Sequence, residues 1–313
     1  MTRTARALQA LLFLAAPLTL TSCAKSTLGD YQPICANAPS ADYASAEQVP
    51  NEEWVSLLLS EERARRDCTG HALAPVELPL RCGAPAQPEP ARALRPEAER
   101  VTVHEASGDF ALVWLPVDEL RDGHKVGLVG FVHVAEKALS LVGIGTIELP
   151  AEQVSLRLRQ VGSDELLFAE GKACPGRGPA GSCERTLELF LLHDGRFVPL
   201  EVRDRHSQCT GAAEVPLALA QDMRLDNGTI RRFDLTATFS VVDDGLLVTE
   251  QLVTTDRAAN SSEENARVFR KSDGSRTLQF TGAYFVSDRE SLWSGMREAR
   301  GTLLSRDPSR SSR

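Results

Sequence analysis

The chain after residue 100 is a series of short apolar or alternating runs. Several runs alternate between apolar and polar residues, which is typical of a strand with one face in water. The intervals between them leave no room for regular crossover helices, so the strands are expected to be antiparallel neighbours. This pattern predicts a mainly β fold, an antiparallel sandwich-like or barrel-like domain. The predicted strands cover residues 101–103, 110–114, 126–134, 139–147, 154–161, 166–170, 186–192, 233–241 and 246–254.

Asp-Gly pairs punctuate these runs. The dipeptide favours the primed β-turns that join antiparallel neighbours, because their backbone twist matches that of the strands. Turns are therefore predicted at Asp122-Gly123, Asp194-Gly195, Asp244-Gly245 and Asp273-Gly274.

Two helices are expected at the ends of this β region. Residues 51–66 place apolar side chains on one side of a helix, and a charged run closes it. Near the C-terminus, Ser287 and Glu290 have the spacing of a capping box. The apolar residues expected to share one helical face are Trp54, Val55, Leu58 and Leu59 in the first helix, and Leu292, Trp293 and Met296 in the second.

The first 23 residues carry a separate pattern. Arg3 and Arg6 precede an apolar run over residues 7–20, which is too short for a membrane span, and Leu20-Thr21-Ser22-Cys23 follows. This segment resembles the signal peptide and lipobox of bacterial lipoproteins. The resemblance implies cleavage before Cys23 and acylation of the new N-terminus, with palmitate as one acyl chain. It also implies attachment to a cell-envelope membrane, and Ala24 in place of aspartate favours the outer membrane. The alternative is an ordinary secretory signal with a chance cysteine.

These patterns divide the chain into five expected parts. Residues 1–22 form the signal peptide, and residues 23–50, which are poor in large apolar side chains, form a flexible tether. Residues 51–99 form a helical, cysteine-containing segment and a proline-rich linker. The antiparallel β domain occupies residues 100–304, and residues 305–313 form a disordered tail.

The cysteines fit an oxidising compartment. Seven are present, and lipidation of Cys23 would leave an even number for disulfides. Cys174 and Cys183 flank a loop of turn-forming residues between two predicted strands, so we predict that they pair. The pairing of Cys35, Cys68, Cys82 and Cys209 stays open. A metal site built from Cys68, His71 and Cys82 is the competing interpretation, although exported thiols tend to oxidise.

Charge and motifs narrow the function classes. The formal net charge is −8, and removal of residues 1–22 would make it more negative by two charges. An acidic chain without a dominant basic patch is a poor candidate for binding nucleic acid. The sequence has no Gly-x-Ser-x-Gly motif, and Gly108 stands where a zinc-protease motif beginning at His104 needs its second histidine. No catalytic residue, cofactor or metal site is therefore assigned.

The hypothesis that follows is a non-catalytic binding or scaffolding lipoprotein. Its partners would be the membrane, through the anchor, and an envelope protein that engages a β surface or an edge strand. One alternative is an envelope hydrolase with a dispersed active site, in which His133 could act as a base or Glu188 and Glu250 as an acid/base pair. The other is a protease-inhibitor-like protein that presents the loop of residues 175–182.

Overall fold

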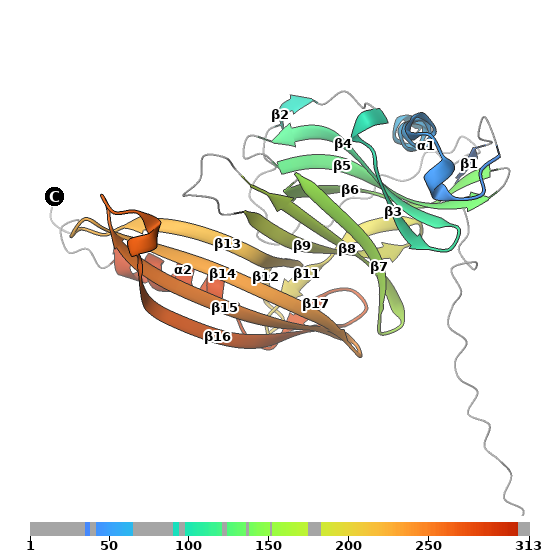
Figure 1. The fold of residues 1–313 in the computed structure, drawn as a ribbon. Helices are drawn as coiled ribbons and strands as arrows, with labels where there is room; N and C mark the ends of the chain where they lie inside the picture. The colour runs from blue at the N-terminus through green and yellow to red at the C-terminus, as the bar shows by residue number, and fades with distance from the viewer. Residues whose placement is uncertain are drawn as a thin grey trace, which may run out of the picture. The chain divides into compact units, whose positions relative to one another are not determined.

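The computed structural model confirms a mainly β fold. It describes residues 35–37, 42–64, 90–93, 98–120, 124–135, 138–150, 152–174 and 183–305. Seventeen strands in this part of the chain belong to one continuous hydrogen-bonded sheet, which branches and curves so that it is sandwich-like in one region and barrel-like in another (Figure 1). No helix among the described residues is long and apolar enough to cross a membrane.

The first region is an antiparallel meander. Its long strands pair in chain order, and the two short strands β1 and β2 pair with β6 and β4. The strands are β1 (Cys35–Asn37), β2 (Pro90–Ala93), β3 (Thr102–Ser107), β4 (Phe110–Leu120), β5 (His124–Ala135) and β6 (Ala138–Pro150).

Helix α1 (Asn51–Ala64) packs on this meander. Its buried residues Trp54, Leu57 and Leu58 join one apolar cluster with side chains of β4, β5 and β6 (Figure 1). Gly130 on β5 permits this approach, because a Cβ there would lie 2.4 Å from Cδ2 of Leu58. The helix predicted over residues 51–66 is thus present, and its apolar side faces the sheet.

The predicted tether does not extend over all of residues 23–50. The backbone of Cys35–Asn37 forms β1, which pairs with β6. Further along, Tyr43 and Val49 are buried in the same cluster as α1. The prediction is wrong for these residues because two large apolar side chains suffice to bring this segment onto the core.

A second region begins with β7 (Gln153–Val161), β8 (Asp164–Ala173) and β9 (Glu184–His193), which pair in order. The predicted disulfide is present between Cys174 and Cys183, at the end of β8 and just before β9, with an S–S distance of 2.03 Å. Strand β9 then pairs with two partners along its other edge. Its first half pairs with β13 (Glu214–Arg224) and its second half with β10 (Arg196–Pro199).

From β13 the pairings lead around a ring. They continue through β14 (Thr229–Val242), β15 (Gly245–Ala258), β16 (Arg267–Phe280), β17 (Phe285–Ser287) and β11 (Glu201–Arg203), and β12 (Cys209–Ala212) pairs with β11. Strand β11 follows β10 directly, so the ring returns to β9. At this corner Leu189, Leu200 and Ala213 exchange backbone hydrogen bonds of 2.8–3.2 Å. The ring encloses an apolar core that includes Phe168, Leu246, Phe280 and Phe285.

The Asp-Gly predictions have mixed outcomes. Asp194 and Gly195 form a turn with φ angles of 47° and 70°, as a primed turn requires, and Asp243 and Asp244 form the turn before Gly245. Asp273-Gly274 is not a turn: both residues lie inside β16, opposite Gln251 and Glu250. Helix α2 packs over this position, where a Cβ on Gly274 would make an ordinary van der Waals contact of 3.5 Å with the Leu292 side chain. Asp122-Gly123 lies outside the described residues.

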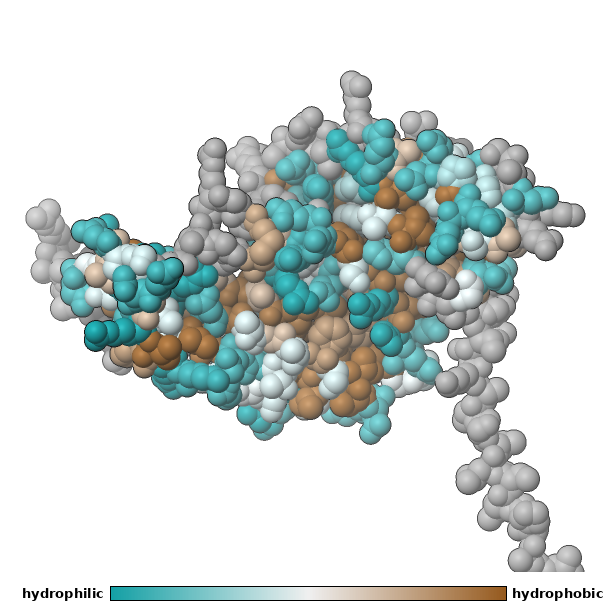
Figure 2. Space-filling model, in the orientation of Figure 1, coloured by the Kyte–Doolittle hydropathy of each residue, from teal (hydrophilic) through white to brown (hydrophobic). Residues whose placement is uncertain are grey.

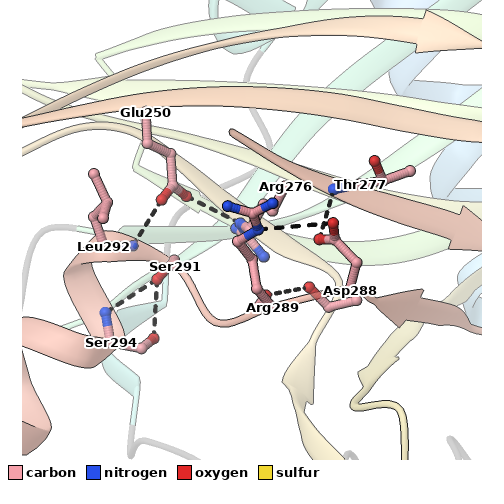
Figure 3. A network of polar contacts seen from close by, with 9 residues as sticks. Glu250, Arg276, Thr277, Asp288, Arg289, Ser291, Leu292 and Ser294 are labelled. Carbon is pink, nitrogen blue, oxygen red and sulfur yellow. Dashed lines mark hydrogen bonds and ion pairs between the residues drawn. The ribbon is translucent and has the colours of Figure 1, made fainter. Parts of the chain in front are cut away.

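Helix α2 (Leu292–Ser305) is present, but its N-terminus differs from the prediction. Ser291 is the N-cap: its Oγ accepts a hydrogen bond of 3.0 Å from the backbone N–H of Ser294 (Figure 3). Ser287, the predicted cap, is buried in β17 and donates to the carbonyl of Arg289. The predicted apolar face is correct, since Leu292, Trp293 and Met296 pack against Phe233, Leu235 and Leu252.

Candidate functional site

The histidines that the structure describes do not form a shared centre with carboxylates. His124 Nδ1 lies 3.3 Å from Glu148 Oε1, and His193 pairs with Asp194 in an exposed turn. His133 stacks on Phe110 at 4.7 Å. Within the described ranges, no three His, Cys, Asp or Glu side chains are grouped as a metal site requires, and Cys68, His71 and Cys82 fall outside those ranges.

The proposed acid/base pair of Glu188 and Glu250 is not formed. Glu188 lies on β9 opposite Glu214. Glu250 lies on β15, where its Oε1 accepts a hydrogen bond of 3.0 Å from Nε of Arg276 (Figure 3). A carboxylate already held by a buried arginine and by a helix N-terminus has a structural role.

The most distinctive concave feature is a cleft beside β14. Strand β14 pairs with β15 along its whole length, but its pairing with β13 ends at Thr236 and Ala218. There β13 turns to β9, where Ala218 also pairs with Arg185. At the other end of the cleft, the N–H of Gly162 donates to the carbonyl of Asp243 at 3.1 Å. A cleft of about 490 Å³ thus opens between residues 237–241 of β14 and one face of β7, β8 and β9.

The floor of this cleft is apolar. Phe168 on β8 and Phe239 on β14 stack with ring centroids 5.8 Å apart, and Leu187 and Leu217 lie beside them. Val241 lines the cleft near the end of the β14–β15 hairpin, where Val242 and Leu247 are also exposed. Figure 2 shows apolar residues gathered on the face in view near this hairpin end.

The rim of the cleft is cationic, so we call it the arginine cleft. Arg157 and Arg159 on β7 and Arg185 on β9 line it together with Glu170. Arg185 is neutralised by Glu170, whose Oε1 lies 3.2 Å from its Nε. Arg157 and Arg159 are exposed and make no hydrogen bond or ion pair with any residue that the structure describes. Two positive charges therefore face the cleft without compensation by any side chain that the structure describes, in a chain of negative net charge.

A second groove continues on the other side of β7. It measures about 540 Å³ and is lined by residues 155–159 together with Val103 and His104 of β3. Nε2 of His104 is buried without a hydrogen-bond partner in the described structure. Burial lowers the pKa of His104, and the nearby charge of Arg157 lowers it further. Both effects favour the neutral form of His104, whereas Arg157 and Arg159 carry positive charge beside β7.

The sequence did not single out these arginines, although one signal was available. Arg157 and Arg159 alternate with Leu156 and Leu158, which places both guanidinium groups on one face of a strand. Such alternation is ordinary for a half-solvated strand, so it gave no reason to expect a site. The missing information was that no acidic side chain in the described ranges pairs with them, since Glu170 pairs with Arg185.

The remaining predicted residues lie away from the arginine cleft or outside the description. Cys209 on β12 is disulfide-bonded, and its partner is not among the described side chains. Only the backbone of Cys35 is described. The structure does not describe Cys23, Cys68, Cys82 or the loop of residues 175–182.

Comparison of the chain with protein-family models, curated proteins and solved structures finds no match. The site is therefore interpreted from its own geometry.

Proposed function

We propose that this chain is a lipid-anchored, non-catalytic binding module of the bacterial cell envelope that holds an anionic ligand in the arginine cleft. The observation that carries the proposal is the pair Arg157 and Arg159. Both side chains line a concave site and have no partner in the described structure. Uncompensated arginines beside an apolar floor fit a ligand that brings negative charge and some apolar surface.

The envelope location is supported by the N-terminal sequence. The lipobox-like segment ending in Cys23 and the disulfide between Cys174 and Cys183 are both typical of exported proteins. Two or more acyl chains anchor a protein stably, and Ala24 in place of aspartate favours the outer membrane, so we propose attachment there. The hydrolase alternative has no comparable support, because neither His124 with Glu148 nor His193 with Asp194 lines the arginine cleft.

The anchor is tested by replacing its nucleophile. Expressed in a Gram-negative bacterium that is fed a palmitate analogue, the unaltered chain is expected to become labelled and to fractionate with membranes. The Cys23→Ser variant is expected to lose the label, because serine has no thiol to receive the lipid. If Cys23→Ser remains labelled, the lipoprotein assignment is wrong.

The binding site is tested with polyglutamate and a sulfated polysaccharide as anionic probes. We expect Arg157→Ala/Arg159→Ala to weaken binding of at least one probe by about tenfold or more, since each guanidinium contributes a charge-assisted hydrogen bond. The matched control is Arg205→Ala/Arg224→Ala, which removes the same charge from exposed positions outside the cleft. Isothermal titration calorimetry at two salt concentrations measures the affinity of both double variants for each probe. Equal losses in the two double variants would show only a general charge effect and contradict the proposed site.

A further inference from the structure

We infer that the anionic ligand is an extended acidic segment of another polypeptide, which adds as a strand to the free edge of β14. This inference rests on the proposed function and specifies its ligand. Beyond Thr236, residues 237–241 have no strand partner on the cleft side within the described structure. A free strand edge presents unpaired N–H and C=O groups, and an extended peptide can satisfy them by pairing.

The composition of this edge favours pairing. Residues 237–241 read Ala-Thr-Phe-Ser-Val, without a charge, a proline or a glycine. The edge of β7 away from β8 also has no strand partner among the described residues, and this strand carries the charges of Arg157 and Arg159. A further long free edge is on β16, where β17 pairs only with residues 278–280. That edge carries Arg267, Arg270 and Lys271, and its register slips at Phe269. Charges and bulges are the usual protection of an edge against strand addition, so β16 is protected and β14 is not.

The position of the β14 edge explains why it can remain unpaired without charges or bulges to protect it from other sheets. At one end the cleft is bounded by Ala218, where β13 stops pairing with β14 and pairs with β9. At the other end it is bounded by the hydrogen bond from Gly162 to Asp243. A long sheet edge from a random neighbour cannot enter a cleft closed at both ends. A single extended segment of about five residues, roughly 17 Å long at the strand rise of about 3.3 Å per residue, matches the free edge.

The charges of Arg157 and Arg159 indicate which residues that segment should contain. Arg157 and Arg159 are two residues apart on one face of β7, and their Cα atoms are therefore separated by about 6.6 Å. Alternate residues of an extended peptide have the same spacing. Acidic side chains at positions i and i+2 of the ligand can each face one arginine. An anionic lipid or saccharide would use the arginines but would leave the β14 edge unpaired.

The test uses the full chain in detergent and a fluorescent five-residue peptide of alternating glutamate and valine. Two derivatives carry N-methyl groups on the backbone of either all glutamates or all valines, so each loses one of the two alternating sets of N–H donors. In a paired strand only one set faces β14. We expect fluorescence anisotropy to show a loss of about tenfold or more for one derivative and a much smaller change for the other. We also expect Arg157→Glu/Arg159→Glu to prefer a lysine–valine peptide.

Each other outcome overturns the inference in a recognisable way. If both derivatives bind as the parent peptide does, the peptide is held by charge alone, and the proposed function stands without strand addition. If the peptide fails to bind but a fatty acid or polygalacturonate binds in an Arg157- and Arg159-dependent manner, the ligand class is wrong and the proposed function stands. If no anionic probe shows dependence on the two arginines, both the inference and the proposed function are wrong.

Discussion

Replacing Glu250 with alanine is expected to lower the free energy of unfolding by about 3–5 kcal/mol, because it leaves a buried arginine without its counter-charge. The side chains of Glu250 and Arg276 are only 3% and 8% exposed. One carboxylate oxygen accepts from Nε of Arg276 at 3.0 Å, and the other accepts from the backbone N–H of Leu292 at 2.7 Å. Glu250 thus joins β15 to β16 and also holds the first turn of α2 (Figure 3).

The matched variant removes both charges. In Glu250→Leu/Arg276→Met, no buried charge is left unpaired, so the expected loss is limited to the helix-terminal contact, about 0.5–2 kcal/mol. Arg289→Ala provides a surface control, since its pair with Asp288 spans 3.7 Å and Arg289 is 62% exposed, and such pairs contribute little. Urea unfolding, monitored by circular dichroism, measures the free energy of unfolding of Glu250→Ala, the double variant and Arg289→Ala. A Glu250→Ala variant as stable as Arg289→Ala would contradict the role assigned to this network.

The sequence predicted the elements whose patterns are local. Strands β5, β6, β14 and β15 follow from apolar or alternating runs, and α1 follows from the spacing of Trp54 and its neighbours. Strand β16 was missed because its first residues, Arg-Val-Phe-Arg-Lys, resemble a solvated loop and its Asp273-Gly274 resembles a turn. It is a strand because β15 pairs with it over its whole length, and such pairing between strands is a tertiary interaction that overrides local preference.

The arginine cleft depends on the separation of β13 from β14, which no local sequence pattern predicts. Strand β13 leaves β14 near Pro216, which has no backbone N–H for a ladder, and its register with β9 slips between Pro216 and Ala218. The proline could be read in the sequence as an irregular strand, but the direction in which β13 turns depends on β9. The cysteines show the same dependence on local pattern. Cys174 and Cys183 flank one hairpin, so their pairing was predictable, whereas a pairing between cysteines far apart in the sequence was not.

Replacing Trp54 with alanine is expected to destabilise the chain by about 3–5 kcal/mol, the cost of removing a large aromatic side chain from a core. Trp54 is 0% exposed and shares its cluster with Val113 of β4 and Leu141 of β6. Its side chain therefore covers the β4–β6 meander. If α1 instead belonged to a separate segment loosely joined to the β domain, Trp54→Ala would melt the helix and leave the unfolding of the strands unchanged.

Two further variants separate packing from other effects of the substitution. Trp54→Phe keeps most of the buried apolar area and removes an indole N–H that has no hydrogen-bond partner in the described structure, so we expect a loss well below that of Trp54→Ala. Trp293→Ala removes a partly buried indole from α2 and should cost less than Trp54→Ala for the same chemical change, because the cost scales with the cavity left behind. Thermal unfolding should remain a single transition for Trp54→Ala, shifted to lower temperature. A separate early transition that carries only helical signal would show that α1 is not part of the β core.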